Sequence, residues 1–201
     1  MELQHVNVKL LAGASAASAA SVADAHADLE PLIPIFHDWI KSRAFGELLL
    51  DVADYRHVPA GPGVVLIGDQ GDYSVDNTGN RLGIRYNRKA PLDGGNQDRL
   101  LQAARAALVA AQRLEAEPRL AGKLRFGARD IELFFNDRLL VPNLPATREA
   151  LRPEFDAFFK KLFRGGEYSL SYGADPRRLF SVSVKTARAF SLADLLANLD
   201  S

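Results

Sequence analysis

The chain has 201 residues, a formal net charge of zero and no cysteine. The absence of cysteine excludes disulfides, thiolate metal sites and thiol redox chemistry. No apolar run approaches the roughly 20 residues that a membrane span needs, and the weakly apolar start around Lys9 follows Glu2, unlike a secretory signal. We therefore expect a soluble, cytoplasmic protein, and its content of Ala, Arg and Leu indicates a bacterial origin.

Charge is divided unevenly along the chain. Residues 1–118 carry a net charge of −4 and residues 119–201 a net charge of +4. This polarity is far from the strongly basic stripe of a nucleic-acid-binding protein. We expect neither nucleic acid nor membrane as a partner.

The chain begins with a strand and a helix separated by a small-residue segment. Alternation of apolar and polar residues at 6–10 predicts a half-buried strand. Residues 12–27 are nearly all Ala, Ser and Gly, which favours a flexible loop, with a partial helix as the alternative. From Leu29 the apolar spacing is helical, and this helix is expected to end before Gly46.

A series of short strands follows the first helix. Each run is rich in β-forming residues, and the separators contain Gly, Pro, Asn and Asp, which adopt turn conformations readily. The pattern predicts an antiparallel meander with strands at residues 48–58, 64–67, 73–75 and 82–87.

Two helices dominate the middle of the chain. Apolar positions on one face predict a long helix over residues 96–117, with Asn96 as its N-cap. After a strand at 131–135 and a proline-rich loop, the spacing of Leu151, Phe155, Phe158, Phe159, Leu162 and Phe163 predicts a core-facing helix that ends at Gly165.

The chain closes with a hairpin and a short helix. Strands are expected at residues 168–172 and 179–185, around a turn at 173–176. Ser191 is expected to cap a final helix over residues 192–199.

These elements predict a single α+β domain over residues 1–201, with largely antiparallel sheet and helices on one side. Residues 1–118 and 119–201 share an order of elements, and each contains a Leu-x-Pro helix start, at 29–31 and 151–153. The order is similar to that of duplicated β-α-β-β ligand-binding domains. A duplication into two β-α-β-β-α units and a chance recurrence of a common order both stay open.

The segment from Asp51 to Gly63 contains the strongest candidate for chemistry. On a strand, Asp51, Tyr55 and His57 point to one face. Imidazole titrates near neutral pH and a carboxylate can fix its tautomer, so these residues are a candidate acid–base or ligand-orienting trio. The alternative interpretation is the rim of a packed surface.

Two further positions are candidate ligand contacts. Arg85 alternates with Arg81 and Asn87 on one strand face, forming a small basic patch that can hold an acidic group, or that serves solubility alone. Trp39 is either a buried anchor or the lining of a groove.

No cofactor or metal is expected. Gly61, Gly63 and Gly68 precede or enclose a strand, so the helix that a phosphate loop requires is missing. Asp69, Asp72 and Asp76 match no calcium loop, and the histidines have no metal-ligand spacing.

Two functional hypotheses follow. The first is a non-catalytic binding or assembly module that presents a groove or a sheet edge to a small molecule or a protein, including a second copy of itself. The second is a small-molecule enzyme with His57 as general acid or base, Asp51 orienting it, and Tyr55 or Arg85 binding the substrate.

Overall fold

In the computed structural model, residues 1–13 and 29–201 are described. The loop expected at residues 12–27 therefore falls outside the described residues from position 14 onward.

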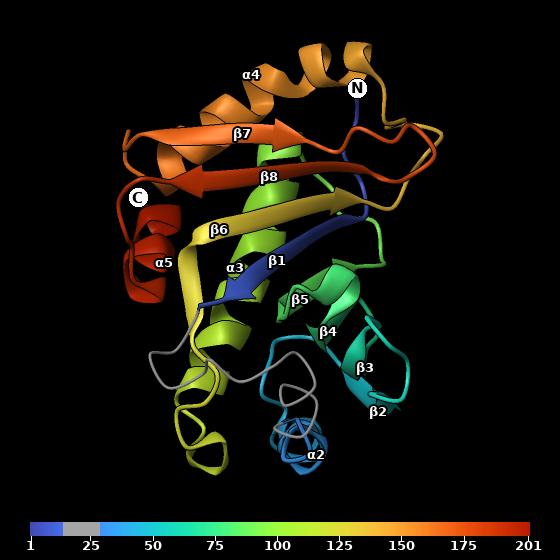
Figure 1. The fold of residues 1–201 in the computed structure, drawn as a ribbon, viewed down its shortest axis with the longest axis vertical. Coiled ribbons are helices and arrows are strands. Elements are labelled where there is room, and N and C mark those ends of the chain that lie inside the picture. The colour runs from blue at the N-terminus through green and yellow to red at the C-terminus, as the bar shows by residue number, and fades with distance from the viewer. Residues whose placement is uncertain (14–28) are drawn as a thin grey trace.

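One antiparallel sheet contains all eight strands of the described residues (Figure 1). Its order is β2-β3-β4-β5-β1-β6-β8-β7, so β5 and β1 lie in the middle, β6 lies beside β1, and β2 and β7 form the two edges. The strands are β1 (Val6–Ala12), β2 (Leu49–Tyr55), β3 (Gly63–Gly68), β4 (Gly71–Asp76), β5 (Gly83–Arg88), β6 (Phe126–Phe135), β7 (Tyr168–Tyr172) and β8 (Phe180–Thr186).

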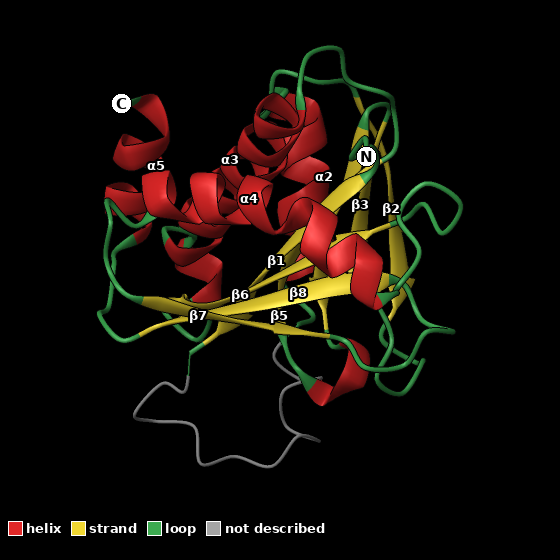
Figure 2. Cartoon of the chain, turned by 90° about the horizontal axis from the view of Figure 1, so that it is seen from above, coloured by secondary structure: helices red, strands yellow, loops and turns green. Residues whose placement is uncertain are grey.

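Four α-helices of the described residues lie on the same side of this sheet, as Figure 2 shows. The α+β prediction with helices on one side is thus confirmed. The helices are α2 (Leu32–Ser42), α3 (Asn96–Glu115), α4 (Pro145–Leu162) and α5 (Leu192–Asp200), with short 3-10 turns η1 (Thr78–Asn80) and η2 (Pro118–Leu120).

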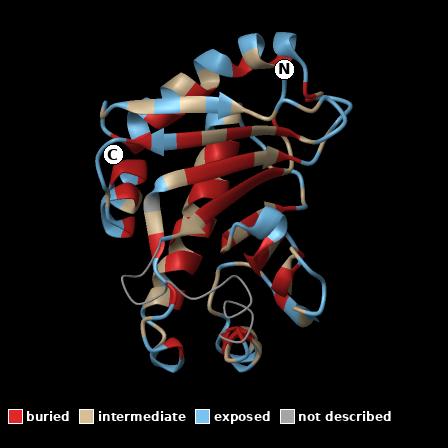
Figure 3. Ribbon diagram, viewed as in Figure 1, coloured by how far each residue is buried: buried red, intermediate tan, exposed pale blue. Residues whose placement is uncertain are grey.

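The core lies between the helices and one face of the sheet. Val8 and Leu10 on β1 pair with Tyr86 and Ile84 on β5, and all four side chains are buried beneath α3. The phenylalanine-rich face of α4 is also buried, as its spacing predicts, and the ring of Phe155 lies 5.8 Å from that of Phe135. Figure 3 shows this buried layer running through the central strands and α3.

The meander forms where the turn residues predict it. The strands β2, β3, β4 and β5 follow one another in both the chain and the sheet. At the start of β3, Gly63 has a positive φ of 68°, and a Cβ there would lie 2.1 Å from the carbonyl oxygen of Val75. Only glycine fits this close approach of two strands.

Four local predictions are wrong, and one is the start of β6, which begins at Phe126 rather than at residue 131. The helix α4 begins at Pro145, so the Leu-x-Pro sequence at 151–153 lies inside it and is not a helix start. Proline is favoured at the first helical position, where its missing N–H loses no hydrogen bond. The N-cap of α3 is Gly95, not Asn96, and β2 ends at Tyr55 rather than continuing to residue 58.

Residues 1–118 and 119–201 meet within the sheet, between β1 and β6. The first strands, β1 and β6, pair with each other from Val6 opposite Phe135 to Leu10 opposite Ile131. The last strand of each half, β5 or β8, pairs with the first strand of that half. This arrangement is what a duplication would produce, but the shared helix start is lost, and duplication stays a prediction.

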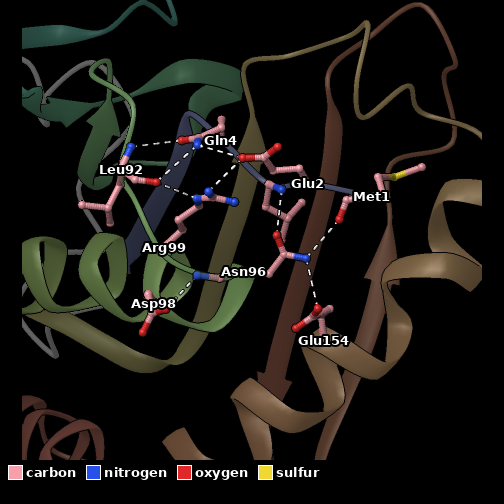
Figure 4. Close-up of polar contacts among 10 residues, drawn as sticks. Met1, Glu2, Gln4, Leu92, Asn96, Asp98, Arg99 and Glu154 are labelled. Carbon is pink, nitrogen blue, oxygen red and sulfur yellow. Dashed lines mark hydrogen bonds and ion pairs between the residues drawn. The ribbon is translucent and has the colours of Figure 1, made fainter.

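Asn96 connects the N-terminal segment with both long helices (Figure 4). Its side-chain oxygen accepts a hydrogen bond from Leu3 N–H at 2.8 Å, and its amide nitrogen donates to the Met1 carbonyl at 3.1 Å and to Glu154 of α4 at 3.0 Å. Arg99 of α3, nearly buried, donates to the carbonyl of Leu92 at 2.9 Å. Asn96 thus holds together three segments that are distant in sequence.

Candidate functional site

The face of the sheet opposite the helices carries polar and charged side chains on its central strands. Register places Lys9 of β1 between Arg85 of β5 and Glu132 of β6, with side chains on the face opposite Val8 and Leu10. We call this the helix-free face. Its most buried polar residues are Asn7, Lys9, Ser74, Asp76 and Glu132.

Lys9 and Asp76 form a buried ion pair on the helix-free face. The side chains are 2% and 1% exposed, and Lys9 Nζ contacts Asp76 Oδ1 directly. Gly83 lies close against β1 beside the lysine, since a Cβ there would lie 2.4 Å from the Leu10 carbonyl oxygen and 3.1 Å from Lys9 Cε. Asp76 also accepts hydrogen bonds from the N–H of Thr78 at 3.0 Å and from its hydroxyl at 2.9 Å. Burial lowers the pKa of Lys9, and the neighbouring Asp76 carboxylate opposes that shift.

Among the cations of this face in the described residues, Arg85 lies farthest from its anionic partner. Its guanidinium lies 3.8 Å from Asp76 and 5.0 Å from the centre of the Phe134 ring. Its Nε is buried and has no hydrogen-bond partner among the described residues. Burial lowers the pKa of Arg85, although an arginine stays charged at any physiological pH. About a fifth of the side chain still reaches solvent.

A groove of about 540 Å³ opens above these charges. Its walls are apolar on the side of β2 and β3, and at its far end Lys89 pairs with Asp72 at 2.7 Å. The lining residues are Tyr55, Pro62, Val65, Ile67, Asp72, Ser74, Asp76, Arg85, Asn87, Lys89 and Asn136. We call this cavity the sheet groove. Asp72 and Asp76 have cationic partners, so the charge least satisfied in the groove is that of Arg85.

Two of the residues singled out from the sequence meet in the sheet groove. Tyr55, at the end of β2, and Arg85, on β5, both line it. His57 lies in the turn after β2, exposed, with its ring 6.4 Å from that of Tyr55, and it is not among the groove's lining residues.

Asp51 and His57 do not contact each other. Asp51 lies four residues before Tyr55, a separation of roughly 13 Å along a strand. Its carboxylate accepts a hydrogen bond from the N–H of the next residue, Val52, at 2.7 Å. The acid–base trio therefore lacks the contact through which Asp51 would orient the imidazole, and its catalytic role stays a prediction.

Asp54, the other carboxylate of β2, is engaged with Arg56. Asp54 accepts two side-chain hydrogen bonds from Arg56, at 2.9 and 2.8 Å, and these lower its pKa to about 2. Asp54 is thus a permanently charged partner of Arg56 rather than a proton carrier near neutral pH.

Trp39 lies on the other side of the sheet, in the layer covered by helices. It is 7% exposed, and its ring is 5.2 Å from that of Phe36 and 5.3 Å from that of Phe45. The structure thus places Trp39 in the core and outside the sheet groove.

A second polar cluster lies on the helix-covered side. Glu47 accepts hydrogen bonds from the Tyr73 hydroxyl at 2.6 Å and from Gly71 N–H at 3.0 Å. Burial, with Glu47 nearby, raises the pKa of Tyr73. These contacts join the loop after α2 to β4, and we interpret the cluster as structural.

Lys9, Asp76 and Glu132 are the site residues that sequence reasoning missed. The alternating pattern of residues 6–10 predicts that Lys9 faces solvent. The sequence contains one relevant signal. If residues 1–118 and 119–201 join into one sheet, the first strand lies in its interior, and side chains on both faces of that strand have neighbours from adjoining strands.

Comparison with protein-family models, with curated proteins and with solved structures finds no match. Within residues 1–13 and 29–201, no group of three or more His, Asp or Glu side chains is arranged to hold a metal ion. In the same residues, no helix has the length and apolar character needed to cross a bilayer.

Proposed function

We propose that this protein is a non-catalytic binding module, and that the sheet groove holds a small molecule through an acidic group placed against Arg85. The observation that carries the proposal is the incomplete pairing of Arg85, a charged side chain on a central strand, beneath an open groove.

The energetics of the helix-free face support a binding role. Burying charges costs several kcal/mol per ion unless good partners compensate it, so a hydrophobic sheet face would often be as stable as the Lys9–Asp76 pair. The cost of these buried charges is explained if they serve binding. In that case Lys9 and Asp76 hold Arg85 in position for a ligand. Side chains on a sheet are more precisely positioned than side chains on loops.

The dimensions and lining of the sheet groove also fit a small molecule. Its volume, about 540 Å³, lies within the range of ligand pockets, roughly 300–1,000 Å³. Val65 and Ile67 supply apolar contact on one side, and Ser74 and Asn87 supply hydrogen-bonding groups beside Arg85. This combination favours a ligand with an acidic end and an apolar or amide-bearing remainder.

The test is calorimetric titration of the wild-type chain and of Arg85→Gln with succinate, glutamate and inorganic phosphate. A charge-assisted hydrogen bond contributes about 1.5–3 kcal/mol, so the substitution should weaken binding of the preferred acid about ten- to a hundredfold. Arg177→Gln, at a side chain that is 88% exposed, makes the same charge change and should leave affinity unaltered.

Succinamide serves as the matched ligand without charge. The proposal predicts that it binds much more weakly than succinate. Equal binding of the two compounds, equal binding by the wild type and Arg85→Gln, or no binding of any acid at millimolar concentration would each contradict the assignment of the groove.

A further inference from the structure

The two edges of the sheet differ in charge. The edge strand β2 carries Asp51 and Asp54, and such charges on an edge strand oppose pairing with another chain. The opposite edge, β7, has the sequence Tyr-Ser-Leu-Ser-Tyr and no charged residue. By the charge on the strand itself, β7 is therefore the less protected of the two edges.

The hydrogen-bond register of β7 shows which main-chain groups face outward. Gly173 N–H donates to the carbonyl of Ser181, in the same register that places Tyr172 opposite Val182. Because hydrogen-bonded and non-hydrogen-bonded pairs alternate in an antiparallel ladder, Ser169 and Ser171 bond to β8. The N–H and C=O groups of Tyr168, Leu170 and Tyr172 therefore point away from the sheet, and no hydrogen bond within the described residues reaches them.

The sequence of β7 is a palindrome centred on Leu170. An antiparallel pair of two identical strands needs each outward-facing residue to meet an outward-facing residue of the other copy. A two-fold axis at Leu170 achieves this, since Leu170 then faces Leu170 and Tyr168 faces Tyr172 of the second copy. About six main-chain hydrogen bonds would form.

We propose that β7 pairs with β7 of a second copy, so that the two sheets join through their uncharged edges. The side-chain pairs in this register are all favourable: tyrosine opposite tyrosine, serine opposite serine and leucine opposite leucine. The interface is isologous, as most homodimer interfaces are. It is separate from the sheet groove and does not rest on the function proposed for it.

The residues of β7 border a cavity and are not fully covered in the single chain. A cavity of about 380 Å³ lies between α4 and β7, lined by Arg152, Asp156, Tyr168, Ser169, Leu170 and Tyr172. Figure 1 shows β7 as the outermost strand, with α4 beside it. Tyr168, Leu170 and Tyr172 are each only partly buried in the single chain. A five-residue ladder is a small interface, so we expect reversible association in the micromolar range.

The first experiment is sedimentation velocity of the full chain from low micromolar to several hundred micromolar. Dimer should form with increasing concentration. An acidic variant, Ser169→Glu with Ser171→Glu, places like charges opposite each other across the axis and should weaken dimerisation about tenfold or more. A basic variant, Ser169→Lys with Ser171→Lys, should do the same.

Mixing the acidic and basic variants distinguishes a lost interface from a damaged fold. Opposite charges then face each other, so a heterodimer should form although neither variant associates alone. Leu139→Glu, at a loop side chain that is 90% exposed, is the control for association through another apolar site.

A second variant tests the main-chain register. Leu170→Pro removes an outward N–H, which an edge strand tolerates, and should give a folded monomer. Ser171→Pro removes an inward N–H and should destabilise the fold itself. A wild-type chain that stays monomeric at several hundred micromolar would overturn the proposal. So would a dimer that persists in both charge variants, a mixture that fails to associate, or a dimer abolished by Leu139→Glu.

Discussion

Lys9 illustrates how one side chain can depend on a single partner. Its ammonium group is removed from water on a central strand, and Asp76 is the carboxylate in direct contact with it. A charge in this position is tolerated only while its partner is present, since an isolated buried ion costs several kcal/mol. The stability of the fold and the position of the Arg85 side chain therefore depend on both Lys9 and Asp76.

Lys9→Met should destabilise the fold by about 3–5 kcal/mol, because buried Asp76 loses the cation in direct contact with it and keeps only Arg85, at 3.8 Å. Adding Asp76→Asn should recover much of this loss, since the amide oxygen can still accept from Thr78. Urea denaturation of the two single variants and the double variant gives the coupling energy. Lys185→Met, which removes an exposed lysine 3.4 Å from Asp130, is the control and should cost less than about 1 kcal/mol. Additive effects at Lys9 and Asp76 would contradict the coupling.

Sequence reasoning identified Tyr55 and Arg85 but could not bring them together. Alternation shows which residues share a strand face, yet it does not show which face the helices cover or which strands become neighbours. Lys9 and Asp76 are 67 residues apart, and their contact depends on the placement of β1 beside β5. Such a pairing is set by the whole sheet rather than by any local pattern.

At the scale of elements, local signals were sufficient for most strands and helices. The meander follows from its turn residues, and Ser191 caps α5 as predicted, accepting a hydrogen bond from Asp194 N–H at 3.0 Å. The beginning of α4 was missed because the loop before Pro145 contains exposed Leu139, Leu140 and Leu144, which blur the helical period. The predicted start of α4 was therefore wrong at a place where apolar residues are exposed.

Asn96 was expected to cap α3, and its observed contacts lead to a different expectation for its removal. Asn96→Ala deletes hydrogen bonds to Leu3, Met1 and Glu154, and we expect a loss of about 1–3 kcal/mol, more than a helix cap alone contributes. Asp98→Ala, which removes the acceptor for Gly95 N–H, should cost about 0.5–1 kcal/mol. Thermal or urea denaturation compares the two, and a smaller effect at Asn96 would refute this connecting role.

At the scale of the molecule, the central pairing of β1 with β6 makes the two halves share one hydrophobic core. Strands from residues 1–118 and 119–201 exchange hydrogen bonds along most of their length, and α3 of the first half contacts α4 and α5 of the second. The prediction of a single domain over residues 1–201 can therefore be tested as a prediction of cooperativity.

Trp39, the only tryptophan, reports on the first half by fluorescence. Leu162→Ala, in the core of the second half, should destabilise the chain by about 2–5 kcal/mol. If the halves unfold together, the fluorescence transition of Trp39 in urea should move to lower concentration by the amount seen in far-ultraviolet circular dichroism. A fluorescence transition that does not move would show two independent domains.

The central place of β1 also has a consequence for synthesis on the ribosome. β1 is translated more than a hundred residues before its sheet neighbour β6. Until β6 is available, one side of β1 has main-chain groups without a partner strand, and these can pair wrongly with other chains. We therefore expect the nascent chain to be most prone to aggregation in the interval between translation of the two strands.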